Sequence, residues 1–310
     1  MSTPASSLPP LPPRDPRGHK GTFGTVAIYG GCAAGQTCMI GAPALAAVAV
    51  LRAGAGLARI VAPDPIIKEA LTIAPSATGV GVETVGGEIA PHVASAAIDA
   101  CASACDCLLV GPGMGVSDGS RAASLRAVQQ EDVSVVVDAD AINCLAQTAA
   151  LHLDFHAAAV LTPHPGEYRR LAESLNVDGD ATDPAGRASA CERLAQRLGC
   201  IVVLKGAGTV VSDGHRTWTN TTGSAALATG GTGDVLAGVV AGLIAQFAAA
   251  SSPGPTTRPL DLYDAARLAV HAHGRAAELW TQSRHASAGL LAVELASFIP
   301  EALEQLRAPD

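Results

Sequence analysis

The positions of apolar residues along the chain predict strands that alternate with helices. Short apolar runs of strand length recur between longer segments in which apolar residues have helical spacing. The expected strands are 25–31, 57–61, 107–110, 133–137, 157–161 and 201–204, and the expected helices are 41–53, 91–105, 119–130, 165–175, 184–198, 235–246, 261–280 and 286–306. This alternation favours an α/β fold of three layers, in which helices cover both faces of a mostly parallel sheet. Such sheets bind ligands at the carboxyl ends of their strands.

Two segments interrupt this alternation. The Asp213-Gly214 pair between two short apolar runs predicts a hairpin over 209–219, because Asp-Gly suits a tight two-residue turn. The Pro- and Ser-rich segment 251–259 predicts a surface loop. We expect a single domain over 19–310, preceded by a flexible Pro-rich tail over 1–18.

Composition narrows the class of protein. The chain has 310 residues, 48% of them hydrophobic and only 3% aromatic, so its core is aliphatic. A formal net charge of −8 argues against nucleic-acid and anionic-membrane surfaces, which need basic patches. The longest apolar run, 235–250, is shorter than the ~20 residues of a membrane span. The sequence therefore predicts a soluble protein whose weakly charged helical surface permits a homo-oligomer.

The cysteines and the N-terminus predict a cytoplasmic protein. Eight cysteines occur without any Cys-x-x-Cys pair, so buried reduced thiols are expected rather than a zinc site or a disulfide framework. The first residues lack the basic start and apolar run of a signal peptide.

The glycine-rich turn that ends in Gly230-Gly231-Thr232-Gly233-Asp234 is the strongest functional feature of the sequence. The glycines allow positive φ and a close approach of backbone amides to a ligand, and an apolar helix follows directly. Amides at a helix N-terminus bind anions such as phosphate. Asp234 has two interpretations, as an ordinary N-cap or as a general base for a substrate hydroxyl beside the phosphate.

Other candidate residues follow the predicted strands. Gly111-Pro-Gly-Met-Gly115 suits a tight turn or a close ligand approach. Asp138 and Asp140 fit either a helix cap or the binding of Mg²⁺ through water. Pro165 and Glu167 predict that His164 caps a helix. Because histidine is a poor cap, we also expect His164 to contact a ligand.

Lys205 ends an apolar strand and precedes Gly206 and Gly208, which places it to meet a nucleotide phosphate or to remain in solvent. His271 and His273 are two residues apart on one predicted helix, point in different directions and are interpreted as structural. Neither a Walker motif nor a dinucleotide-binding Gly-x-Gly-x-x-Gly is present.

Taken in order, these motifs resemble the ADP/ATP-dependent NAD(P)H-hydrate dehydratases of the ribokinase-like superfamily. The resemblance rests on eight segments: 20–24, 30–31, 52–56, 111–115, 138–143, 162–167, 205–206 and 229–234. Within this family, the chain is similar to the free-standing bacterial type that has no epimerase domain and uses ADP.

The resemblance implies a ribokinase-like fold and the repair of hydrated NADH or NADPH, with phosphorylation of the ring hydroxyl and loss of phosphate. It implies that Asp234 is the base, assisted by the turn Gly231, Thr232 and Gly233. It implies substrate contacts at Ala42, Gly113, His164 and Asp234, and nucleotide contacts at Lys205, Gly206, Ala207, Gly208, Thr209 and Gly233. ADP, with ATP as the alternative, would be the co-substrate, Mg²⁺ would bridge its phosphates, and a separate NAD(P)H-hydrate epimerase would be the functional partner.

Two other hypotheses share the same turn. A small-molecule kinase of this superfamily, of the hydroxyethylthiazole kinase type, would leave its product phosphorylated. A nucleotide-binding regulator would turn nothing over, although a carboxylate beside phosphates gives a pure binding site no advantage.

Overall fold

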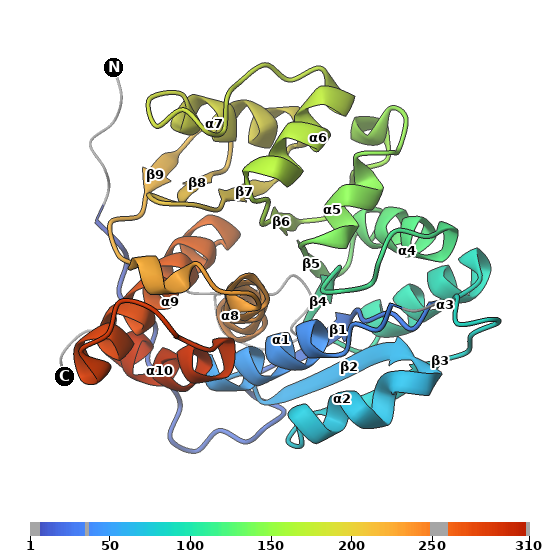
Figure 1. Ribbon diagram of the computed structural model, residues 1–310, viewed down its shortest axis with the longest axis horizontal. Coiled ribbons are helices and arrows are strands. Elements are labelled where there is room, and N and C mark those ends of the chain that lie inside the picture. Colours follow the sequence, from blue (N-terminus) through green and yellow to red (C-terminus); the bar gives the residue numbers. More distant parts are fainter. Residues whose placement is uncertain (1–6, 35–36, 249–259, 308–310) are drawn as a thin grey trace.

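A nine-stranded sheet lies at the centre of the molecule (Figure 1). The structure is a computed structural model that describes residues 7–34, 37–248 and 260–307. In this part of the chain the strands are β1 (Thr25–Tyr29), β2 (Leu57–Pro63), β3 (Thr78–Val82), β4 (Cys107–Val110), β5 (Ser134–Val137), β6 (Ala159–Leu161), β7 (Ile201–Leu204), β8 (Val210–Ser212) and β9 (Thr217–Thr219). Their order is β3-β2-β1-β4-β5-β6-β7-β8-β9. Neighbours from β3 to β7 are parallel, and β8 and β9 are antiparallel.

Helices cover both faces of the sheet, which confirms the predicted three-layer α/β/α architecture. One layer contains α1 (Gly41–Arg52), α2 (Ile67–Ile73), α8 (Thr232–Phe247), α9 (Leu262–Arg284) and α10 (Ala292–Glu304). The other contains α3 (Pro91–Ala102), α4 (Asp118–Val128), α5 (Asp140–Leu145), α6 (Pro165–Leu175) and α7 (Arg187–Leu198). Short 3₁₀ segments lie at Asp64–Ile66, Leu151–Leu153 and Ala225–Leu227.

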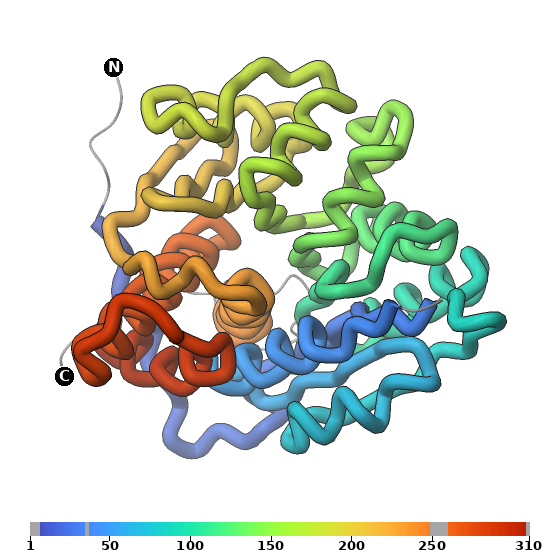
Figure 2. The backbone as a smooth tube through the Cα atoms, in the orientation of Figure 1, coloured from blue at the N-terminus to red at the C-terminus, as the bar shows by residue number. Residues whose placement is uncertain are grey.

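The sheet separates two aliphatic cores. On β1, Val26 and Ile28 pack with the α1 and α8 layer, while Ala27 and Tyr29 pack with the α3 to α7 layer, as the alternation of side chains along a strand requires. Distant segments meet in the first layer, where α1 and α10 lie side by side (Figure 2).

Helices α1 and α8 approach each other very closely because small residues line their contact. A Cβ added to Gly238 would lie 2.4 Å from the carbonyl oxygen of Ala46, and one added to Gly242 would lie 2.9 Å from Ala53 Cβ. This contact fixes the N-terminal ends of the two helices relative to each other.

Most of the predicted elements are present, including the hairpin. The sequence interpretation missed β3, α2 and α5. Strand β3 is an edge strand that contains Gly79 and Gly81 and is exposed except at Val82, so it has no apolar run to reveal it.

The expected flexible tail is wrong for the part around Leu11. The apolar side chain of Leu11 is buried and covers the end of α10. The Leu11 N–H donates to the carbonyl of Leu306 at 2.8 Å. Residues 1–6 of the predicted tail and the predicted loop 251–259 lie outside the described residues.

The eight cysteines are free thiols. Six are buried, but Cys105 is half-buried and Cys38 is exposed, so the expectation of buried thiols fails at these two positions, which lie in connecting segments. Within the described ranges, we find no helix with the length and apolar character needed to cross a membrane.

Candidate active site

Helix α8, seen end-on near the centre of Figure 1, begins at the glycine-rich turn. Gly231 is its N-cap and has a left-handed backbone with φ of 88°, which favours glycine. A Cβ at Gly231 would also lie 2.8 Å from Leu45 Cδ1. Among the described residues no side chain caps this helix. The N–H groups at its start are therefore available to an anion.

The side chain of Thr232 is used inside the turn. Its hydroxyl lies 2.9 Å from the carbonyl oxygens of both Leu227 and Thr229, to which it donates. This residue thus offers a ligand its backbone rather than its side chain.

Asp234 lies three residues into α8, so the interpretation of Asp234 as the N-cap is wrong. The side chain is half-buried. In the described parts of the chain, no group donates a hydrogen bond to its carboxylate or forms an ion pair with it. Burial and the charge of Asp138 raise the pKa of Asp234 to about 7. A carboxylate with these properties is suited to take a proton from a bound hydroxyl near neutral pH.

Lys205 lies among buried carboxylates at the ends of β5 to β7. Its Nζ donates to Asp138 Oδ1 at 2.8 Å and lies 3.8 Å from Glu167 Oε2. Burial lowers the pKa of Lys205, but the charges of Asp138 and Glu167 outweigh burial and raise it above its usual value. Lys205 therefore stays an ammonium ion, and its charge opposes the rise in the pKa of Asp234.

His164 caps α6, as the sequence predicted. Its Nδ1 accepts hydrogen bonds from the N–H groups of Gly166 and Glu167 at 2.9 and 3.3 Å, and Glu167 Oε2 accepts from the His164 N–H at 2.8 Å. This is a reciprocal capping box. Burial and the charge of Lys205 lower the pKa of His164. The side chain is 50% exposed, so a ligand contact by His164 stays a prediction.

A cavity of about 630 Å³ lies beside Lys205 and the start of α8. This volume lies within the roughly 300–1,000 Å³ of small-molecule sites. Its lining contains all six residues predicted to contact the nucleotide: Lys205, Gly206, Ala207, Gly208, Thr209 and Gly233. The fold thus brings the end of β7 and the start of α8 to one cavity.

The same cavity is also lined by residues 220–225 and part of α9, which the sequence did not predict as nucleotide contacts. Asn220 Nδ2 donates to the Thr222 carbonyl at 2.9 Å, and the Asn-Thr-Thr-Gly run is a turn signal that could have marked this segment. His273 on α9 is buried, and its Nε2 donates to the Thr232 carbonyl at 2.8 Å. Burial lowers the pKa of His273 to about 4. Neutral His273 thus links α9 to the first turn of α8 through this hydrogen bond.

Ala42 and Gly113, two predicted substrate contacts, lie next to each other. Gly113 has φ of 63°, and a Cβ there would lie 3.1 Å from both Ala42 Cβ and Met39 Cβ. Ala42 is on the first turn of α1, one turn before Leu45, which contacts Gly231. The start of α1 therefore connects these residues to the start of α8.

Asp138 and Asp140 were interpreted as either a helix cap or a magnesium site. Ala139 is the N-cap of α5, and no side chain of the described residues caps this helix. Asp138 pairs with Lys205, and Asp140 Oδ2 accepts a hydrogen bond from the Gly115 N–H at 2.9 Å. The cap interpretation is therefore wrong for both. Nowhere in the described ranges do three or more His, Cys, Asp or Glu side chains form a group able to hold a metal ion.

Comparisons with known proteins show which family the sequence is similar to. A family model described as NAD(P)H-hydrate dehydratase matches residues 31–301. The bifunctional NAD(P)H-hydrate repair enzyme Nnr of Salinibacter ruber is 37% identical over 269 residues, which cover 84% of this chain and 45% of that protein. The chain spans about half the length of the curated relatives it matches.

Solved structures share the fold. The ADP/ATP-dependent NAD(P)H-hydrate dehydratase of Bacillus subtilis, co-crystallised with ATP/Mg²⁺, matches with a TM-score of 0.74 and 29% identity over 98% of this chain and 100% of that chain. The ribokinase of Giardia lamblia matches with a TM-score of 0.57 over 91% of this chain and 99% of that chain. At 13% identity, the ribokinase supports the ribokinase-like fold alone.

Proposed function

The chain belongs to the NAD(P)H-hydrate dehydratase family, and on that premise we propose that it repairs hydrated NADH and NADPH at the expense of ADP. The ring hydroxyl of the (S)-hydrate attacks the terminal phosphorus of ADP, and AMP leaves. The phosphate ester then breaks its C–O bond, phosphate departs with the bonding electrons, and the neighbouring ring carbon loses a proton. The products are NAD(P)H, AMP and phosphate, and the elements of water from the ring end in the phosphate.

The observation that carries this proposal is the carboxylate of Asp234. Among the described residues it has no hydrogen-bond or ion-pair partner, its pKa is about 7, and it lies in the first turn of a helix without a side-chain cap. At neutral pH about half of such groups are ionised, so Asp234 accepts the hydroxyl proton as the oxygen attacks. The N–H groups of residues 231–233 stabilise the charge that develops on the transferred phosphoryl group.

The large cavity supports the binding of the nucleotide beside this base. Residues 205–209 would hold the nucleotide, and Gly233 would place its terminal phosphate at the start of α8. Ala42, Gly113 and His164 would contact the hydrate. ADP is preferred to ATP in this proposal because of the resemblance to the free-standing bacterial enzymes, and an NAD(P)H-hydrate epimerase would supply the (S)-epimer.

Magnesium fits this site as a companion of the nucleotide. Mg²⁺ commonly binds through phosphates, waters and one or two carboxylates, which agrees with the lack of a group of three ligating side chains in the described ranges. Asp138 and Glu167 are the carboxylates next to Lys205, which lines the cavity, and both pair with it. The ion would neutralise phosphate charge during transfer.

The test mixes the protein with hydrated NADPH, Mg²⁺ and either ADP or ATP. Regained dihydronicotinamide absorbance with an equimolar amount of phosphate supports repair. A stable phosphorylated product would instead identify a small-molecule kinase, and nucleotide binding without turnover would identify a regulator. Asp234→Asn should abolish turnover and leave nucleotide binding largely intact. A near-normal rate in that variant would mean that Asp234 is not the base.

A further inference from the structure

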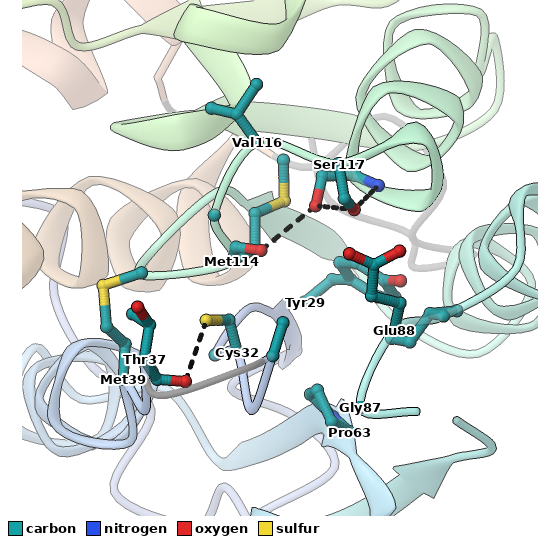
Figure 3. A pocket seen from close by; sticks show the side chains of 15 residues that line it. Tyr29, Cys32, Thr37, Met39, Pro63, Gly87, Glu88, Met114, Val116 and Ser117 are labelled. Carbon is teal, nitrogen blue, oxygen red and sulfur yellow. Dashed lines mark hydrogen bonds between the residues drawn. The ribbon is translucent and has the colours of Figure 1, made fainter. Parts of the chain in front are cut away.

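A second cavity, of about 220 Å³, lies at the same edge of the sheet (Figure 3). Residues from three connecting segments line it: 31–34 and 37–39 after β1, 87–89 before α3, and 114–120 at the start of α4. It shares no lining residue with the larger cavity. Its volume is about seven times the ~30 Å³ of a water molecule in the liquid. It therefore has room for a group of about nucleoside size but not for a whole dinucleotide.

This cavity continues from the predicted substrate contacts. Met39 lines it, and a Cβ on Gly113 would lie 3.1 Å from Met39 Cβ. Gly115 also lines it and donates its N–H to Asp140, whose charge contributes to the raised pKa of Asp234. The cavity is thus connected with the catalytic carboxylate through the starts of α1 and α5. Ala42 and Gly113 thus lie between the start of α8 and this cavity.

The lining matches a nucleoside rather than a phosphate. Met39 and Met114 form an apolar wall, and Glu88 lies on the other side of the view with its carboxylate directed toward the Ser117 side (Figure 3). Glu88 is the one charged residue among the described lining residues, with no lysine, arginine or histidine beside it. The hydroxyls of Ser117 and Ser120 already bond each other, and the Ser120 hydroxyl also donates to the Met114 carbonyl.

The carboxylate of Glu88 is free to bind a ligand. Glu88 is exposed, and none of the residues that the structure describes donates a hydrogen bond to its side chain. Its backbone pairs with Val85, so the side chain is not needed to shape the loop. A carboxylate accepts hydrogen bonds from the two hydroxyls of a ribose, as in sites that bind NAD. It repels a phosphate on the same ribose.

We propose that this cavity holds the adenosine end of the hydrated dinucleotide and that Glu88 binds the ribose hydroxyls, which makes the protein selective for the NADH hydrate over the NADPH hydrate. This inference rests on the proposed repair function and adds a specificity-determining residue to it. Glu88 acts on substrate binding and not on the chemical step, because it lies away from the reacting ring.

The test compares kcat and KM for the two hydrates, with ADP and Mg²⁺, in the wild type, Glu88→Gln and Glu88→Lys. The wild type should prefer the NADH hydrate by at least about tenfold in kcat/KM. Glu88→Gln should reduce this preference severalfold and Glu88→Lys should reverse it, in both cases through KM. The dissociation constants of NADH and NADPH, measured from their fluorescence, should change in the same order.

Glu131→Lys is the matched control, because this exposed carboxylate lies between α4 and β5, at the opposite edge of the sheet. It should leave the preference unchanged. If all variants turn over both hydrates with an unchanged ratio, the inference is wrong and the repair function stands. If the wild type turns over neither hydrate, the proposed function itself is refuted, and this inference with it.

Discussion

Asp234→Asn should make the protein more stable while it removes the activity. The pKa of Asp234 is raised from 3.8 to about 7, first by burial and then by the charge of Asp138. The folded protein therefore holds this proton more tightly than the unfolded chain does. As the pH rises from about 4 to 7, the unfolded chain loses the proton more easily, and the wild type loses stability. Asparagine has no such proton to lose.

The size of the effect follows from this pKa difference. About three pKa units at 1.36 kcal/mol each set an upper limit of roughly 4 kcal/mol on the gain in unfolding free energy. Solvent reaches part of the Asp234 side chain, so we expect about 1–2 kcal/mol to be realised. For a domain of 310 residues that corresponds to a rise in Tm of roughly 1.5–3 °C.

The assay is thermal unfolding of both proteins from pH 4 to pH 8. The difference in Tm should be near zero at pH 4 and largest at pH 7 to 8. Asp180→Asn is a control of opposite sign, because hydrogen bonds from the Thr182 hydroxyl and N–H lower the pKa of Asp180. This control should not gain stability at any pH. Equal Tm values for Asp234→Asn and the wild type across the range would show that the folded protein does not disfavour this carboxylate.

Three more outcomes follow from the site. The kcat/KM for the hydrate should fall on the acid side with an apparent pKa near 7, so that the rate at pH 6 is about one tenth of that at pH 8; a rate that falls only near pH 4 would contradict this. His273→Ala should raise the KM for the nucleotide and lower kcat, each by roughly tenfold, because the Thr232 carbonyl loses its hydrogen-bond donor. His273→Gln should recover part of both effects. Equal kinetics in the wild type and the two variants would exclude a positioning role for His273. Gly238→Ala should lower the unfolding free energy by about 1–3 kcal/mol in urea, since its Cβ meets a backbone oxygen at 2.4 Å; Gly230→Ala, where nothing lies within 4 Å, is the control and should lose less.

The sequence predicted the fold where the apolar pattern is strong. Strands such as β4 and β5 are buried throughout, so an uninterrupted apolar run marks them. Strand β3 has little buried surface, and α5 has only six residues. Neither element therefore shows a regular spacing of apolar residues in the sequence.

The candidate site was predictable where one segment carries it. The glycine-rich turn and the His164 cap are each local, and so is the segment 205–209 that is predicted to contact the nucleotide. The bond from Lys205 to Asp138 joins positions 67 residues apart, and that from His273 to Thr232 joins positions 41 apart. Such contacts depend on which strands and helices become neighbours, and local spacing does not contain that information.

The close contact between α1 and α8 restricts how this protein exchanges its ligands. Gly238 and Gly242 leave no space for one helix to slide along the other. The proposed base on α8 and the predicted substrate contact on α1 must then move as one rigid unit. Under the proposed function, we therefore expect nucleotide entry and release to depend on the loops that flank the β8–β9 hairpin, while α1 and α8 stay still.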